Sequence, residues 1–511
     1  MVPLLRRDGC ARRRAVVAVA AGVLALASAC GGASDLTGGS EPEPDPTTGP
    51  TNPTDATDDP SEGPKIPEDN LRGAESEPVD DPYYPQHGEP YLDTLQYDLD
   101  LDWDPAAKLL IGEAEIAFRV TEPRDEIQFD FGKPLRITDA TLDGAPAETD
   151  EDGADLVITT PGLTADGYHT LNLSYRGSPE PVKAAGSRSD LLSVGWTTES
   201  DGSAWTLQEP WGAYTWYPVN DHPSDKAFYT ATISAGAGMI GVFNGEQLDE
   251  SSDGDVTTTV WHVGTPVASY LVTIAIGHYE VHTDEGPDGL PITYWVPEDD
   301  TEALDWLEES PDMLAWLEDT LGPFPFSRIG AVVVPSDSAM ETQTLVTMGE
   351  GVFRADEVTL RGALLHEYAH QWYGDVVTPD NWPDLWLNEG FAMYIQLLWS
   401  DSVGLLDYDG TIDNWAALDG QMRSQYGPPG AYYEDEFASS NVYYSGAVML
   451  HRIREQIGDK AFFDALREWP TVHEYGNANR DDYISWLSDE TGTDLGPFIN
   501  EWLTSPTTPS E

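Results

Sequence analysis

Two histidines, His366 and His370, stand four residues apart in RGALLHEYAHQWYG, a segment whose apolar residues recur with helical spacing. On a helix, side chains at positions i and i+4 project from the same face, so both imidazoles can approach one metal ion. Glu389 follows in a second helical segment, DLWLNEGFAMYIQLLW, which opens after Pro383. We therefore expect a fold in which these two helices pack together, because antiparallel packing would bring Glu389 to the histidines.

These three residue types match the ligands of a catalytic zinc site, which takes three protein side chains and leaves one position for water. Glu367, between the histidines, lies beside the same space and can act there without binding the metal. The alternative is a pair of histidines on a polar helix face, but the glutamate of NEG on a second helix favours the metal. We predict one Zn²⁺ per chain, bound by His366, His370 and Glu389.

Short alternating runs of polar and apolar residues dominate the chain from Tyr83 to about residue 283, among them LQYDLDLDW, EAEIAFRV and AFYTATISA. A period of two indicates half-buried strands joined by turns. We predict an antiparallel β-sandwich or saddle domain over residues 81–283. Helical periods follow, around one short apolar strand, IGAVVVP. They predict a mixed α/β, mainly helical domain over residues 284–505 and a tail at 506–511.

The first thirty residues have the pattern of an export signal. An arginine-rich start, RRDGCARRR, leads into AVVAVAAGVLALASA, an apolar run too short to span a bilayer comfortably. Cys30 follows LASA directly and resembles the acylated cysteine of a bacterial lipoprotein. We expect residues 1–29 to be removed and Cys30 to anchor the protein on the outer face of the cytoplasmic membrane. Ala27 stands where such signals prefer leucine, so plain secretion is the alternative.

Composition limits the remaining classes of partner. Residues 30–80 are rich in proline, glycine, threonine and acid, which predicts a disordered tether. The whole chain has 25 Lys and Arg against 91 Asp and Glu, a net charge of −66. Such a charge repels nucleic acid and anionic lipid, so we expect no nucleic-acid partner and membrane contact only through Cys30. Cys10 would leave with the signal, so packing rather than an internal disulfide holds the fold.

HEYAH, followed by eighteen residues and the glutamate of NEGFA, resembles the M1 family of zinc aminopeptidases, a group of gluzincins. Other segments are similar to that family in the same order: YDLDLDW, WYPVNDHPSDKA, YLVTIAIGHY and LGPFPFSRIGAVVVP. The resemblance covers residues 83–505. It implies an N-terminal β domain packed on a thermolysin-like catalytic domain, in a short form without the C-terminal helical domain of many relatives.

The resemblance also implies a substrate-binding segment. The family's exopeptidase motif, G-A/G-M-E-N, corresponds to SAMET, in which Glu341 would bind the free α-amino group of the substrate and Ala339 and Met340 would contact the peptide. The segment follows a strand and can itself be an edge strand, which would align a peptide. Ser338 and Thr342 replace the family's glycine and asparagine, so the preference for one N-terminal residue does not carry over.

Two further roles are implied, each with a competing neighbour. A second amine anchor corresponds to Glu209 in WTLQEPWGAY, where Gln208 is the weaker candidate. A tyrosine near the metal corresponds to Tyr443 in SSNVYYSG, where Tyr444 competes. A phenol hydroxyl in that place can donate to the oxyanion that develops during hydrolysis.

Together the residues and the resemblance imply a zinc-dependent aminopeptidase that removes the N-terminal residue from peptides with a free N-terminus. Glu367 would be the general base that activates water. Two alternatives remain at this stage. One is a gluzincin endopeptidase, which would cut N-terminally blocked peptides. The other is a non-catalytic surface binding lipoprotein on an M1-like scaffold.

Overall fold

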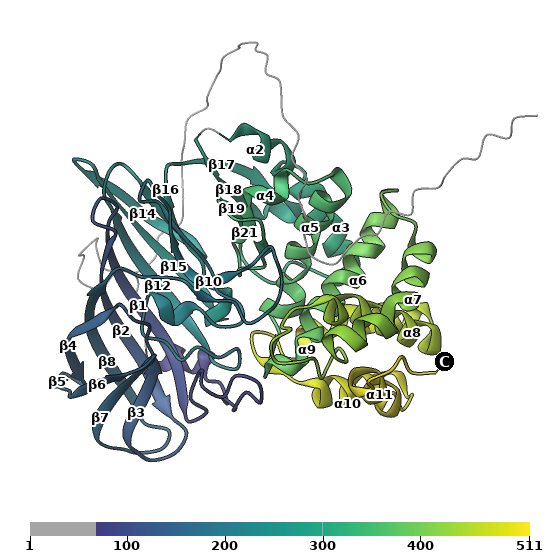
Figure 1. Cartoon of the computed structure of the whole chain (residues 1–511), viewed down its shortest axis with the longest axis horizontal. Coiled ribbons are helices and arrows are strands. Elements are labelled where there is room, and N and C mark those ends of the chain that lie inside the picture. The colour runs from purple at the N-terminus through teal and green to yellow at the C-terminus, as the bar shows by residue number, and fades with distance from the viewer. Residues whose placement is uncertain (1–67, 299, 511) are drawn as a thin grey trace, which may run out of the picture.

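The chain forms two bodies, a β domain followed by a mainly helical domain, as the sequence predicts (Figure 1). The computed structural model describes residues 68–298 and 300–510. The predicted export signal, Cys30 and most of the predicted tether lie outside the described residues.

An eight-stranded sheet with the strand order β14-β15-β12-β1-β2-β8-β4-β5 is the centre of the β domain. Neighbouring strands are antiparallel, except that β1 and β12 run parallel. In β1 the alternation of LDLDW is followed closely, with Leu99, Leu101 and Trp103 buried and the intervening aspartates exposed. The strands are β1 (Leu92–Asp104), β2 (Leu109–Val120), β4 (Arg136–Leu142), β5 (Ala145–Pro146), β8 (Tyr168–Gly177), β12 (Lys226–Ala235), β14 (Glu246–Asp253) and β15 (Val256–Ala268).

Two smaller sheets complete this domain. One has five strands in the order β13-β16-β11-β10-β9, and the other has three in the order β3-β7-β6. The loop between β9 and β10 contacts the helical domain. The strands are β3 (Arg124–Asp130), β6 (Thr149–Asp152), β7 (Asp155–Leu163), β9 (Val182–Lys183), β10 (Ser193–Thr198), β11 (Ala204–Leu207), β13 (Ile240–Phe243) and β16 (Ile274–Gly277).

The predicted tether over residues 30–80 extends too far toward the β domain. Residues 68–80 fold on the large sheet, starting with the short helix α1 (Glu68–Leu71). Leu71 and Ala74 are buried there in one cluster with Phe228. The prediction is wrong for this part because two buried apolar residues, Leu71 and Ala74, do not produce a periodic pattern within a polar, proline-containing segment.

A five-stranded sheet with the order β17-β18-β19-β21-β20 opens the helical domain. β18, β19 and β21 are parallel, and the outer strands β17 and β20 are antiparallel to their neighbours. Because β17 pairs with β18, the boundary predicted at residue 283 falls inside a strand of this sheet. The strands are β17 (Tyr279–Glu285), β18 (Pro291–Pro297), β19 (Ile329–Val334), β20 (Ala339–Met340) and β21 (Val346–Gly349).

Helices make up most of the rest of this domain. The first helical stretch, residues 301–321, is divided into α2 and α3, with Pro311 in the first turn of α3. No helix among the described residues is both long and apolar enough to cross a membrane. The helices are α2 (Thr301–Leu307), α3 (Ser310–Leu321), α4 (Glu350–Phe353), α5 (Glu357–Ala369), α6 (Trp386–Ser402), α7 (Tyr408–Tyr426), α8 (Gly446–Ile457), α9 (Asp459–Val472), α10 (Arg480–Thr491) and α11 (Gly496–Thr504).

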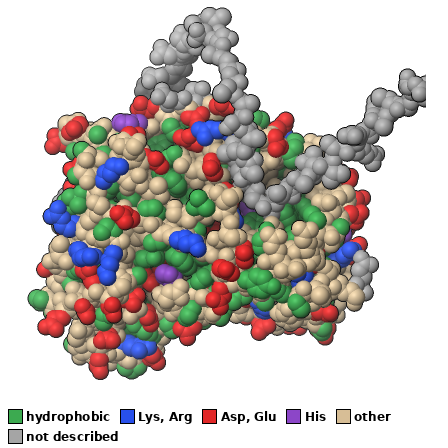
Figure 2. Space-filling view, viewed as in Figure 1, with side chains coloured by type: hydrophobic (Ala, Val, Ile, Leu, Met, Phe, Trp, Pro, Cys, Tyr) green, Lys and Arg blue, Asp and Glu red, His purple; other side chains and the backbone are tan. Residues whose placement is uncertain are grey.

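The buried apolar core continues from one domain into the other. Tyr270, just after β15, packs edge-on against Trp382 of the helical domain with ring centroids 5.0 Å apart. Acidic side chains are spread over the visible face of the molecule, among fewer basic ones (Figure 2). The candidate active site lies where the two domains meet.

Candidate active site

Helix α5 presents His366 and His370 at its C-terminal end. The helix begins after Asp356, whose carboxylate accepts hydrogen bonds from main-chain amides of the first turn. It ends at Ala369, before the end of the predicted segment. His370 still has helical backbone angles, φ −62° and ψ −24°, and the two imidazole centroids are 4.6 Å apart. The predicted i, i+4 relation therefore holds.

Glu389, in the first turn of α6, meets both histidines. Its Oε2 atom lies 3.0 Å from Nε2 of His366 and 3.5 Å from Nε2 of His370. All three side chains are at most 3% exposed. One possible ligand atom from each lies within 4.8 Å of the others. The structure thus brings together the three residues that the sequence predicted as metal ligands.

The hydrogen bond made by His370 fits metal binding. Its Nδ1 atom lies 3.0 Å from the carbonyl oxygen of Tyr373, which can only accept, so Nδ1 carries the ring proton. Nε2 then has a free lone pair, and it is buried without a hydrogen-bond partner in the described chain. The carbonyl reaches the ring because the helix breaks here, at Gly374 with φ +136°. Two imidazole nitrogens and a carboxylate are ligands that suit zinc. The carbonyl of Tyr373 does not bind the metal but fixes the orientation of the His370 ring.

Glu367 lies beside the cluster and is not one of its three members. It is buried, and one of its carboxylate oxygens lies within 4.8 Å of ligand-type atoms of His370 and Glu341. Burial raises the pKa of its carboxyl well above the usual range. This is the position expected from the sequence for a general base.

Glu209 and Glu341 approach the same cluster from two different domains. Glu209 follows β11 of the β domain and Glu341 follows β20, yet carboxylate oxygens of both lie within 4.8 Å of Glu389 and of each other. Oε1 of each glutamate is buried with no hydrogen-bond partner among residues 68–298 and 300–510. Burial and then the carboxylates of Glu341 and Glu389 raise the pKa of Glu209. Acids crowded in this way are suited to bind a cation.

Gln208, the competing candidate for the amine anchor, faces away from the cluster. Its Nε2 donates to the carbonyl of Ser269 at 2.6 Å, and its Oε1 accepts from the indole of Trp216 at 3.0 Å. Both polar groups are therefore used inside the β domain. The geometry favours Glu209.

Tyr443 faces the cluster, and Tyr444 does not. The Tyr443 hydroxyl donates to Oε1 of Glu389 at 2.9 Å, and its ring lies over that of His366 with centroids 5.8 Å apart. Tyr444 stacks on Trp415 at 4.7 Å, in the helical core. The π-helical turn η7 (Asn441–Ser445) directs the two neighbouring tyrosines to different places.

Comparison with known proteins agrees with this geometry. The family model described as the Peptidase M1 N-terminal domain matches residues 93–271, and the one described as the Peptidase family M1 domain matches residues 306–502. The chain belongs to peptidase family M1. Zinc is accordingly its cofactor.

This M1 peptidase is similar in sequence to curated aminopeptidases. It is 26% identical over 444 residues to Aminopeptidase M1-B of Oryza sativa subsp. japonica, covering 80% of this chain and 49% of the relative. It is 30% identical over 321 residues to Aminopeptidase N of Lactobacillus helveticus, covering 57% of this chain and 37% of the relative. The chain therefore spans half or less of these relatives' lengths.

A solved structure matches along nearly its whole length. The M1 zinc metallopeptidase from Deinococcus radiodurans superimposes with a TM-score of 0.74 and 26% identity, over 85% of this chain and 98% of that one. A mutant of the Deinococcus protein, bound to the substrate Tyr-Ser-Ala, gives a TM-score of 0.75 and 27% identity, over 85% and 99%.

The segment that the sequence predicts to bind substrate in this M1 peptidase is an edge strand, as expected. β20, formed by Ala339 and Met340, pairs with β21 and is last in the strand order. Thr342, which replaces the family's asparagine, turns its hydroxyl inward, to the carbonyl of Leu345 and to Thr347. The hydroxyl of Ser338, which replaces the glycine, faces the β domain.

Two residues of the M1 site were not found from the sequence. Gln371, directly after His370, donates to the main-chain carbonyl of Glu341 at 3.1 Å and accepts from the amide of Thr344 at 2.9 Å. Gln371 thus ties the segment after β20 to the segment after α5. Its position directly after HEYAH was the only signal in the sequence. Arg188, the second, had no sequence signal.

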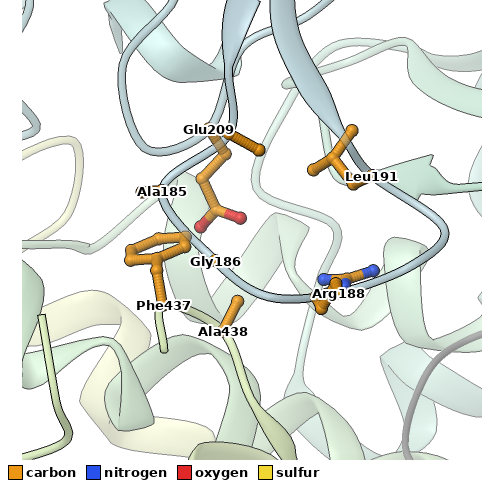
Figure 3. A pocket seen from close by; sticks show the side chains of 8 residues that line it. Ala185, Gly186, Arg188, Leu191, Glu209, Phe437 and Ala438 are labelled. Atoms are coloured by element: carbon orange, nitrogen blue, oxygen red, sulfur yellow. The ribbon is translucent and has the colours of Figure 1, made fainter. Parts of the chain in front are cut away.

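A pocket opens beside the cluster between the two domains (Figure 3). The Glu209 carboxylate points into it, and Arg188 lies across from it on the loop between β9 and β10. The lining residues are Ala184, Ala185, Gly186, Arg188, Leu191, Glu209, Phe437 and Ala438. A guanidinium and a buried carboxylate, from two separate segments of the β domain, thus face the same narrow pocket.

Proposed function

We propose that this protein is a zinc-dependent aminopeptidase that removes the N-terminal residue from peptides with a free N-terminus. The observation that carries the proposal is the pair of buried carboxylates, Glu209 and Glu341, with unpartnered oxygens beside the histidine cluster. A substrate ammonium would pair with them in a site with little water. An internal residue of a peptide has no charge to offer there.

The chain's own residues supply the remaining chemistry. Zinc held by His366, His370 and Glu389 would act as a Lewis acid toward the scissile carbonyl and would lower the pKa of the attacking water. Glu367 takes a proton from that water and returns it to the leaving amine. The hydroxyl of Tyr443 turns from Glu389 to the carbonyl oxygen as negative charge develops on it.

The comparisons support this reading at the level of the class. The relatives are named aminopeptidases, and the similar Deinococcus structure is described with a bound tripeptide substrate. The preference for peptides with a free N-terminus rests on Glu209 and Glu341 of this chain.

A matched pair of substrates tests the proposal. The zinc-loaded protein should cleave alanyl-aminomethylcoumarin and a free tripeptide, and it should cleave their N-acetylated forms far more slowly. A chelator should abolish the reaction, and added zinc should restore it. Equal cleavage of free and acetylated substrates would instead identify an endopeptidase. Peptide binding without turnover would identify a binding lipoprotein.

We also propose that the enzyme works outside the cell, attached to the membrane through an acylated Cys30. The export-signal pattern that ends at Cys30 supports this. Labelled palmitate should be incorporated into the expressed protein and not into Cys30→Ser. Unlabelled protein recovered from the medium would favour plain secretion.

A further inference from the structure

The loop between β9 and β10 extends from the β domain to the proposed active site. The amide of Ala184 donates to the carbonyl of Leu192 at 3.1 Å, which closes the base of the loop. At its far end, the Ser187 hydroxyl donates to the carboxylate of Glu436 in the helical domain. Figure 3 shows the loop passing beside the pocket with Arg188 on it. The β domain thus contributes a guanidinium to the site.

Arg188 is held in place by two partners. Its Nη2 donates to Oδ2 of Asp190 at 2.6 Å, and its Nε lies 3.3 Å from Oδ1 of the same carboxylate. Nη2 also donates to the hydroxyl of Ser338 at 3.1 Å. The Arg188 side chain is 16% exposed and that of Asp190 is 3% exposed. A two-point contact with a carboxylate fixes the plane of a guanidinium.

Ser338 closes this arrangement. Its hydroxyl accepts from Arg188 and donates to Oδ2 of Asp190 at 3.2 Å. A glycine, which the resemblance would place at this position, has no hydroxyl to do either. The departure at Ser338 therefore coincides with a charged pair from the β domain that uses it.

The remaining nitrogen of the Arg188 guanidinium reaches the proposed catalytic tyrosine. Nη1 donates to the hydroxyl oxygen of Tyr443 at 3.2 Å. A guanidinium has only donors, so it occupies a lone pair of that oxygen, and the hydroxyl hydrogen must point elsewhere. In this structure it points to Oε1 of Glu389, at 2.9 Å. A hydroxyl that accepts a charged hydrogen bond is also a stronger donor.

We propose that Arg188 is a positioning residue for Tyr443: fixed by Asp190 and Ser338, its guanidinium holds the hydroxyl oxygen in place, so that the hydroxyl hydrogen is free to turn from Glu389 to the reacting carbonyl. This rests on the function proposed above. Arg188 and Asp190 form an ion pair, which as a whole carries no net charge to attract acidic substrates. Arg188 therefore affects catalysis only by its hydrogen bond to the hydroxyl oxygen of Tyr443.

Kinetics of four proteins test this coupling: wild type, Arg188→Met, Tyr443→Phe and the double variant. Arg188→Met should lower kcat about 10- to 100-fold with KM changed less than about threefold, since an interaction made in the transition state is weakened. In the Tyr443→Phe background the same change should cost less than about threefold, because no hydroxyl is left to position. Equal losses in both backgrounds, or a change in KM alone, would overturn the proposal.

Three further variants separate positioning from loop anchoring. Ser187→Ala removes the loop's contact with Glu436 and should keep wild-type kcat. Ser338→Ala removes one support and should lower kcat about 3- to 10-fold, and Arg188→Lys should recover part of the Arg188→Met loss. If Ser187→Ala lowered kcat as much as Arg188→Met, the loop as a whole would matter and the proposal would fail. Zinc content and thermal melting confirm that each variant is folded.

A measurement without turnover separates this proposal from the proposed function. With 3-fluorotyrosine at position 443, wild type should give one narrow ¹⁹F resonance, because the ring is held in one orientation. Arg188→Met should split or broaden it, and Ser187→Ala should not. An unchanged spectrum in Arg188→Met would overturn the positioning role even in an active aminopeptidase. An inactive wild type with the expected spectra would overturn only the proposed function.

Discussion

Gly390 and Gly446 are in main-chain contact: a methyl group on Gly446 would lie 2.8 Å from the Cα atom of Gly390. Gly390 directly follows Glu389 on α6, and Gly446 opens α8 after the turn that carries Tyr443. Their close approach lets the Tyr443 hydroxyl come within 2.9 Å of Glu389. Two glycines thus bring two of the proposed active-site residues together.

Gly446→Ala should push α6 and α8 apart, since the new methyl group would collide with the main chain of Gly390, which can move only together with α6. We expect the free energy of unfolding to fall by about 1–3 kcal/mol. We expect kcat to fall at least about tenfold, because Tyr443 shifts, while zinc stays bound by residues of α5 and α6. Urea unfolding, metal analysis and coumarin kinetics measure the three effects.

The control is Gly420→Ala, in the exposed face of α7, where the methyl group would meet only Thr508 Oγ1 at 3.5 Å. It should be neutral or stabilise the fold by up to about 1 kcal/mol, because alanine favours helix. Wild-type kcat in Gly446→Ala would show that the contact does not set the position of Tyr443.

Glu367→Gln should keep zinc and lose turnover. Glutamine has nearly the same shape but cannot accept the proton of water, and a general base contributes about 10²- to 10⁴-fold. Single-turnover kinetics and metal analysis of the same preparation measure both quantities. Glu357→Gln, at the exposed start of the same helix, is the matched control and should behave as wild type. Normal turnover in Glu367→Gln would assign the base elsewhere.

The metal ligands could be predicted because the information is local. His366 and His370 share one helix, and Glu389 opens the next, so helical periodicity and a short spacing locate all three. Glu209 and Tyr443 lie far from the predicted metal ligands in the sequence, so only the family resemblance identified them. Only the structure distinguished Glu209 from Gln208 and Tyr443 from Tyr444, because adjacent side chains point to different surroundings.

The role of Arg188 and the exact domain boundaries could not be predicted from the sequence. Arg188 contacts Tyr443 across 255 residues, and no pattern near either residue reports such a contact. The predicted boundary at 283 divided β17 because a strand does not reveal which sheet it joins. The folded residues 68–80 were missed because so few of them are apolar and buried.

Glu209→Gln and Glu341→Gln should each weaken recognition of a free amine. A hydrogen bond to a charged group is worth about 1.5–3 kcal/mol, so kcat/KM for alanyl-coumarin should fall about 10- to 100-fold in each variant. The acetylated substrate has no ammonium and is the internal control: its residual cleavage should not fall. Parallel losses on both substrates would show that these glutamates support the fold rather than the amine.

Tyr443→Phe should lower kcat about 10²-fold or more, because the developing oxyanion loses a donor. Tyr444→Phe is the neighbouring control and should change kcat less than about threefold, since that ring stacks on Trp415 in the core. Stopped-flow kinetics at saturating substrate distinguishes the two. The reverse order of effects would exchange the roles of these tyrosines.

Lys226, on β12, is buried where the domains meet, and its Nζ donates to the main-chain carbonyl of Asp375 at 2.8 Å. Burial lowers the pKa of its ammonium from 10.5 to about 7, and Asp375 only partly opposes this. Between these values the unfolded chain holds a proton that the folded chain lacks. The free energy of unfolding should therefore rise with pH across this window, by about 1.4 kcal/mol per pH unit, and the cost of burying the charge is fully present below pH 7.

Lys226→Met removes the titrating group, so the variant should lack this rise. Urea unfolding at fixed free zinc should show wild type gaining on the variant by about 1.4 kcal/mol per pH unit between about pH 7.5 and 9.5, with a constant difference below about pH 6. Lys460→Met, whose parent side chain is 90% exposed, should keep the wild-type slope. If wild type and Lys226→Met had the same slope, the ammonium would stay charged in the folded protein. The buried Asp375 carboxylate, which has no hydrogen-bond partner in the described residues, would then be its counter-ion.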